Sequence, residues 1–165
     1  MSLKDTIKDD MKAAFKAGDT ATRGALSMLL SVIQNRELEK RAKLMKAGAT
    51  TETEVAAASQ LTDEEVIDAL SSEIKKRRES VATYEQGGRP ELAASEQAEI
   101  TVFQKYLPEQ LSEEAVRALI AEAVAATGAA GPKDIGKVMG AVTPKTKGRF
   151  DGARVSELVK AALQG

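Results

Sequence analysis

The chain of 165 residues contains neither cysteine nor histidine. The absence of cysteine excludes disulfides, thiol nucleophiles and thiolate metal sites. The absence of histidine excludes the Ser-His-Asp triad and removes the commonest general base and the commonest metal ligand. Aromatic residues make up 3% of the chain although 42% of it is hydrophobic, so any core must be built from aliphatic side chains and alanine.

Long apolar segments are also missing from the sequence. No run of about 18 apolar residues occurs, so we expect no transmembrane helix. The N-terminal sequence MSLKDTIKDD has no apolar core of the kind that signal peptides carry. Together these two features predict a cytoplasmic protein.

Motifs for cofactor chemistry are absent as well. The chain has no G-x-x-x-x-G-K-[ST] sequence and no strand-flanked G-x-G-x-x-G, so nothing indicates nucleotide binding, and we predict no cofactor and no metal. Ser71 and Ser72 lie in a predicted helix, where only lysine could act as the base for a serine nucleophile. We therefore predict no catalytic residues and expect that the chain is not an enzyme by itself.

Helical patterns run through most of the chain. Apolar residues recur at three- and four-residue spacing, which is typical of amphipathic helices. Ser2, Thr62 and Ser112 are placed to cap helix N-termini, whereas Gly18 and Gly128 are placed to end helices. No segment of strand length alternates apolar and polar residues. The sequence therefore predicts an all-α protein.

The Leu107-Pro108 pair interrupts this pattern, because the residue before a proline is disfavoured in a helix. Ser112 then begins a new helix and is followed by two glutamates, which the helix dipole favours in a first turn. We predict an N-terminal helical bundle of about four helices over residues 1–107 and a small three-helix domain over residues 109–165.

Two segments of the N-terminal half have weaker helical patterns. Residues 36–46 are strongly charged with few apolar anchors, so we expect this end of the second helix to project or fray. Residues 47–61 are rich in alanine and threonine without a clear period, which predicts a mobile loop, with a short helix inside it as the alternative.

Glu96 and Glu99 share the apolar side of the fourth helix, and we expect them to pair with the basic run at 75–78.

Residues 133–160 are the most informative part of the chain. Their sequence pattern predicts a helix, a basic loop and a second helix. Pro132 suits the first turn of the first helix, where its missing N–H is not needed. Pro144 is expected to end that helix, and Asp151 is placed to cap the next one.

Gly136 and Gly140 lie inside the first of these helices, where each costs about 1 kcal/mol relative to alanine. Glycines four positions apart make a smooth groove that suits close approach by another backbone. One interpretation is structural, in which the glycines allow tight packing of the helix pair. The other is functional, in which the groove receives a partner.

The same stretch is basic. It holds seven basic and three acidic residues, so its net charge is +4, and the rest of a chain whose total is −1 carries −5. Lys145, Lys147 and Arg149 lie in the predicted loop, and Lys137 and Arg154 could widen the patch. Such a run is usually a solvated surface. The alternative is a phosphate-binding surface that contacts the RNA backbone beside a helix N-terminus.

Three segments carry a family likeness. They are KKRRESVATYEQGGRPELAASEQAEI, YLPEQLSEEAV and DIGKVMGAVTPKTKGRFDGARVSELVK, of which YLPEQLS and GKVMG followed by KGR-x-DG are the most specific. On these residues the chain resembles the YqeY family over nearly its whole length. It departs from the common pattern in its long connection at 47–61 and in Phe150, where a small residue is usual.

The resemblance implies an N-terminal helical bundle and a C-terminal domain similar to the tail of the B subunit of the glutamine-dependent aspartyl/glutamyl-tRNA amidotransferase. In that enzyme the tail helps to hold tRNA, while the carbon–nitrogen ligase chemistry with glutamine as amido donor lies on other domains and subunits. Those catalytic parts are absent from this sequence, so the resemblance does not transfer the activity.

Two functions remain open from the sequence. One is a non-catalytic module that binds tRNA or another structured RNA, with amidotransferase or aminoacyl-tRNA-handling proteins as possible partners. The alternative is a protein-interaction scaffold whose Gly136/Gly140 groove receives a partner helix. Salt separates the two, because phosphate contacts weaken steeply with salt and an apolar groove does not.

Overall fold

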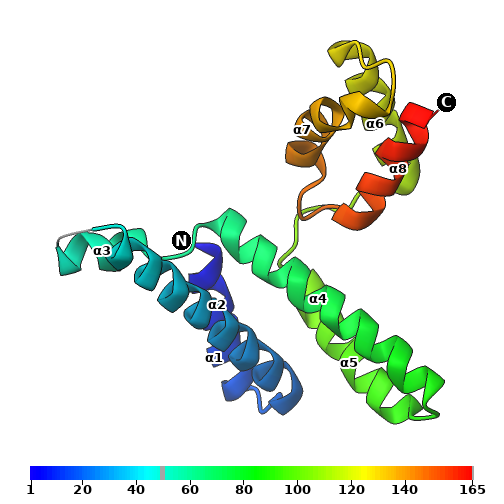
Figure 1. Ribbon diagram of the computed structural model, residues 1–165. Helices are drawn as coiled ribbons and strands as arrows, with labels where there is room; N and C mark the ends of the chain where they lie inside the picture. The colour runs from blue at the N-terminus through cyan, green and yellow to red at the C-terminus, as the bar shows by residue number, and fades with distance from the viewer. Residues whose placement is uncertain (49–50, 165) are drawn as a thin grey trace. The chain divides into compact units, whose positions relative to one another are not determined.

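The computed structural model describes residues 1–48 and 51–164, and the helices dominate it (Figure 1). The chain divides into two compact units, Met1–Tyr106 and Leu107–Gly165. The prediction of an all-α protein is confirmed: every regular element in the described part of the chain is helical. That the two units are independent domains stays a prediction.

The described residues of the first unit form five helices, whereas about four were predicted. They are α1 (Leu3–Lys16), α2 (Thr20–Lys46), α3 (Glu52–Ala58), α4 (Asp63–Gln86) and α5 (Pro90–Gln104). Ser2 and Thr62 each cap a helix as expected, with Asp5 and Glu65 completing the reciprocal capping boxes. The core is aliphatic apart from Phe103, and its largest fully buried members include Ile7, Leu26, Leu29, Ile33, Leu70 and Ile100.

The expectation that residues 36–46 project or fray is wrong, because α2 continues to Lys46. Two ion pairs hold this end: Lys40 Nζ lies 2.8 Å from Glu65, and Arg41 Nη2 lies 3.2 Å from Glu52. Lys40 also donates to the Gln60 carbonyl. The charged side chains therefore supply contacts that the few apolar anchors could not.

The predicted loop at 47–61 contains the short helix α3, so the alternative interpretation was the better one. Thr51 caps it by accepting from the Glu54 N–H, and Val55 is buried. Residues 49–50 of the predicted loop lie outside the described part of the chain.

A buried ionic cluster joins α4 to α5. Arg77 and Glu73 are each 6% exposed, and Glu99 accepts from Arg77 Nε at 2.8 Å. The expected pairing of Glu99 with the basic run is confirmed. Burial alone would raise the pKa of Glu73, but hydrogen bonds from Lys76 and Arg77 bring that pKa below its ordinary value.

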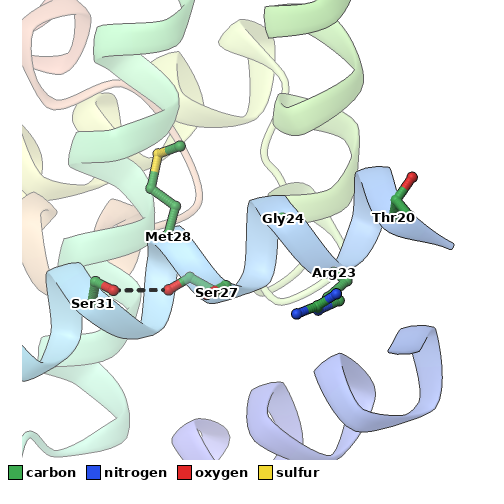
Figure 2. Close-up of a pocket in the computed structure, with 6 residues that line it drawn as sticks. All are labelled: Thr20, Arg23, Gly24, Ser27, Met28 and Ser31. Carbon is green, nitrogen blue, oxygen red and sulfur yellow. Dashed lines mark hydrogen bonds between the residues drawn. The ribbon is translucent and has the colours of Figure 1, made fainter. Parts of the chain in front are cut away.

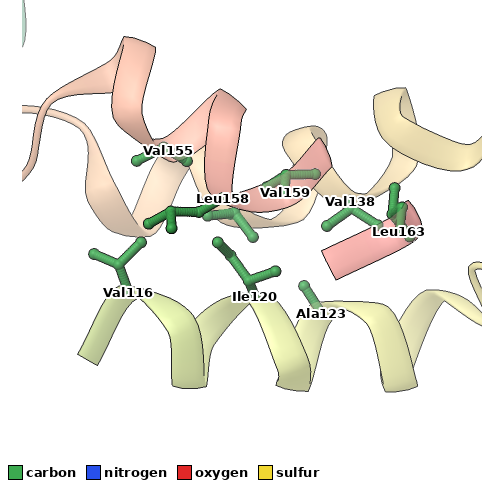
Figure 3. Packing of buried hydrophobic residues seen from close by; sticks show 9 residues of the cluster. Val116, Ile120, Ala123, Val138, Val155, Leu158, Val159 and Leu163 are labelled. Carbon is green, nitrogen blue, oxygen red and sulfur yellow. The ribbon is translucent and has the colours of Figure 1, made fainter. Parts of the chain in front are cut away.

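The second unit holds α6 (Glu113–Thr127), the 3-10 turn η1 (Pro132–Asp134), α7 (Ile135–Thr146) and α8 (Gly152–Gln164). Ser112 caps α6 and Gly128 ends it at φ +65°, as predicted. Val116, Ile120, Val138, Leu158 and Val159 interdigitate between the three helices (Figure 3). This core fixes which face of α7 is left for solvent.

Pro144 does not end α7, contrary to the prediction, because the helix runs on to Thr146. The ring removes one backbone hydrogen bond at an exposed turn, where water can replace it. Burial of Thr146 then holds the last turn, and its hydroxyl donates to the Val142 carbonyl at 3.2 Å. Lys145 is therefore a helical residue, and the loop is shorter than expected.

Candidate nucleic-acid interface

Helix α7 presents one face to the core and the other to solvent. Val138, Val142 and Thr146 are buried, so the opposite side of a helix with 3.6 residues per turn is exposed. We call this side the outer face of α7; it consists of Lys133, Gly136, Lys137, Gly140, Thr143, Pro144 and Lys147, all of them exposed. Three of these seven residues are lysines and none is acidic.

The two glycines of the outer face are open to solvent. A Cβ placed on Gly136 or on Gly140 would meet nothing within 4 Å among the described neighbouring atoms. The interpretation that they permit tight packing within the chain is therefore wrong. The remaining interpretation is that the two open positions, which lie between lysines on the outer face, receive a partner.

Two of the predicted cations lie on α7 with loosely held ammonium groups. Lys137 Nζ is 3.3 Å from Asp134, and its side chain is 68% exposed. Lys145 Nζ is 3.5 Å from Glu122 of α6, at the flank of the outer face. Surface pairs of this kind contribute little, so either lysine can exchange its carboxylate for another anion.

Arg149, by contrast, is used inside the unit. Its Nε donates to the Glu109 carbonyl at 2.9 Å, and its own carbonyl accepts from the Leu111 N–H at 2.8 Å. Gln110 adds a bond to the Gly148 carbonyl at 2.8 Å, where Gly148 takes φ +70°. These bonds tie the segment before α6 to the loop after α7, which gives Arg149 a structural role.

Arg154 is likewise engaged. Its Nε lies 3.1 Å from Glu113 and its Nη1 lies 2.8 Å from Glu157. The hydrogen bonds that Arg154 donates to Glu113 and Glu157 raise the pKa of Arg154. The bonds that Glu113 accepts, from Arg154 first and then from Arg117, lower the pKa of Glu113. Arg154 thus joins the start of α6 to the start of α8, and its charge is largely neutralised.

The five predicted cations therefore differ in their surroundings. Lys137 and Lys147 share the outer face, Lys145 flanks it, and the two arginines hold the scaffold around it. Sequence reasoning counted Lys133 among the basic residues but did not place it on this surface. Its three- and four-residue spacing from Gly136 and Lys137 was the signal that could have found it.

The described residues contain neither a candidate metal-binding group nor a candidate membrane-spanning helix. In residues 1–48 and 51–164, His, Cys, Asp and Glu form no group of three or more that could hold a metal ion. None of the helices in that part is both long and apolar enough to cross a bilayer.

Comparisons with known proteins place these features in context. A family model described as Yqey-like protein matches residues 43–163. A Candida glabrata protein named "Altered inheritance of mitochondria protein 41, mitochondrial" is 28% identical over 104 residues, which cover 63% of this chain and 49% of the relative. An Eremothecium gossypii protein of the same name is 28% identical over 101 residues, covering 61% and 46%.

The chain spans about half the length of the curated relatives it matches. Both relatives are named as mitochondrial proteins, which contradicts the prediction of a cytoplasmic protein. That prediction rested on the lack of a long apolar run and of an apolar signal core, and apolar character does not report on every targeting route.

Proposed function

Because the chain belongs to the YqeY family, as its residues indicated, we propose that its C-terminal unit is a non-catalytic module that binds tRNA or another structured RNA by the phosphate backbone. The outer face of α7 is the observation that carries this proposal. Lys133, Lys137 and Lys147 supply cations there, and no carboxylate belongs to the face.

The glycines explain how a phosphodiester chain could come close. Gly136 and Gly140 leave the middle of the face without side chains, so a ribose-phosphate backbone can lie against the helix while the lysines reach its phosphates. Contacts of this type position an RNA without reading its sequence. The module is therefore expected to prefer structured RNA by shape over any short sequence motif.

The arginines have a supporting role in this proposal. Arg149 and Arg154 hold the ends of α6, α7 and α8 together, so that the outer face is presented by a fixed helix. Lys145 lies near enough to the face to add a phosphate contact once it leaves Glu122. The amidotransferase relation enters only through the resemblance, and we assign no catalytic residue.

The test is the salt dependence of tRNA binding by the full chain, measured by fluorescence anisotropy. The variant replaces Lys133, Lys137 and Lys147 with glutamine. Each lost phosphate contact lowers the magnitude of the slope of log affinity against log salt by about 0.7–0.9, so the triple variant is expected to lose about 2–3. The affinity loss should be similar for unrelated tRNA sequences.

A matched control replaces Lys12, Lys16 and Lys75, three exposed lysines of the first unit, with glutamine. It removes the same charge and should leave the slope near that of the unaltered chain. Equal losses in both variants, or no binding at low salt, would refute the proposal. The scaffold alternative, in which a partner helix fills the open Gly136/Gly140 strip, predicts partner binding that hardly changes with salt.

A further inference from the structure

Helix α2 carries an exposed seam along its whole length of 27 residues. Positions at alternating four- and three-residue spacing, as in a coiled coil, lie on this side. The exposed residues that occupy them are Thr20, Gly24, Ser27, Ser31, Gln34, Leu38 and Met45. Arg41 is the one charged residue on the seam. In a chain that is 30% charged, a nearly uncharged face about 40 Å long is unusual.

The two halves of this α2 seam differ in size. The N-terminal half carries small side chains and forms a shallow hollow bounded by Arg23 and Met28 (Figure 2). A Cβ on Gly24 would meet nothing within 4 Å among described atoms. The Ser31 hydroxyl donates to the Ser27 carbonyl, so it keeps a hydrogen bond when the hollow is covered. The C-terminal half is large and apolar: Leu38 is 56% and Met45 60% exposed.

We propose that the α2 seam pairs with the α2 seam of a second copy of this chain in antiparallel orientation. A two-fold axis near the middle of the seam then places Leu38 opposite Ser27 of the second copy, and Met45 opposite Thr20. Each large apolar side chain then packs against the small side chains in the N-terminal half of the other α2 seam. The α2 seam is therefore complementary to itself. Gly24 faces Arg41 of the second copy and leaves room for its long stem.

Charges at the margins fit the same orientation. The antiparallel alignment brings Asp19, the N-cap of α2, beside the last turn of the other α2, which carries Lys43 and Lys46. It also brings Arg23 beside Arg41 of the second copy, where the exposed Glu52 already pairs with that arginine at 3.2 Å. Glu52 then lies between the two cations and offsets part of their repulsion.

A parallel pairing does not have these properties. It would set Leu38 against Leu38 and Met45 against Met45 at one end and leave Gly24, Ser27 and Ser31 facing one another at the other. Such an arrangement leaves the small half underpacked, and it brings two copies of Arg41 together. The order of small and large side chains along the α2 seam therefore favours the antiparallel pairing.

The oligomeric state of the full chain tests the proposal. Sedimentation equilibrium up to about 100 µM, where micromolar association is well populated, should give twice the 17.5 kDa mass of one chain. Leu38→Glu should weaken the dimer by about tenfold or more, because it buries a charge. Glu39→Gln, at the exposed neighbouring position, should leave it unchanged, and both variants should keep the circular dichroism of the parent.

Orientation is read by cross-linking, which is simple in a chain without cysteine. Ser27→Cys and Leu38→Cys chains are mixed and treated with a short bismaleimide. The antiparallel pairing predicts efficient cross-linking in the mixture and little in Leu38→Cys alone. A monomer at all concentrations, a dimer that is insensitive to Leu38→Glu, or efficient cross-linking of Leu38→Cys with itself would each overturn the proposal.

Discussion

The guanidinium of Arg77 lies in a buried ion pair with Glu73, one helical turn earlier, with Nη1 2.7 Å from Oε2. Its Nε reaches Glu99 on α5, and its Cζ lies over the Phe103 ring, 4.6 Å from the ring centroid. One cation thus holds an acid on each of two helices and covers the aromatic centre of the core. The pairing therefore orients α4 against α5 besides neutralising charge.

Removing the cation should be costly. Arg77→Ala would remove the buried partner of Glu73 and leave it only the exposed Lys76, and breaking a buried pair in this way costs about 3–5 kcal/mol of the free energy of unfolding. Urea denaturation of the full chain measures the loss. Arg78→Ala, which removes an exposed arginine at the adjacent position, is the matched control and should change stability by less than about 0.5 kcal/mol. Similar losses in both variants would contradict the assignment.

Acid should destabilise the same cluster. The pKa of Glu73 is lower in the folded chain than its ordinary value of 4.5. A lowered carboxyl pKa contributes stability that is present above the unfolded value and is lost as the pH falls through the folded value. The free energy of unfolding should therefore decline below about pH 5. Glu73→Gln should flatten that decline, and an unchanged pH profile would show that Glu73 is not responsible.

The local signals in the sequence were sufficient for most of the fold. Ser2 and Thr62 were recognisable as caps because a capping box involves residues three positions apart. The extension of α7 past Pro144 was not recognisable, since it depends on the burial of Thr146 by residues distant in sequence. The intramolecular partners of the two site arginines could not be predicted for the same reason: those of Arg154 include Glu113, 41 positions away.

The open glycines make a prediction that separates stability from binding. Gly140→Ala should raise the free energy of unfolding by up to about 1 kcal/mol, because alanine is the better helix former and its Cβ has free space. If a phosphate backbone lies on the outer face, the same methyl group should weaken tRNA binding. Thermal melts and anisotropy on one variant measure both. A more stable chain with unaltered tRNA binding would show that the RNA does not contact this part of α7.

The C-terminal unit should fold by itself. Every buried member of its core lies between Val116 and Leu163, and the apolar residues packed against that core begin at Leu111. The bonds that Arg149 donates to the Glu109 carbonyl and that Gln110 donates to the Gly148 carbonyl also stay within the unit. A chain of residues 107–165 should therefore show a helical circular dichroism spectrum and a cooperative thermal melt. Val142→Asp in the same fragment, which buries a carboxylate in that core, should abolish the transition. A parent fragment that melts without cooperativity would show that the unit depends on the rest of the chain.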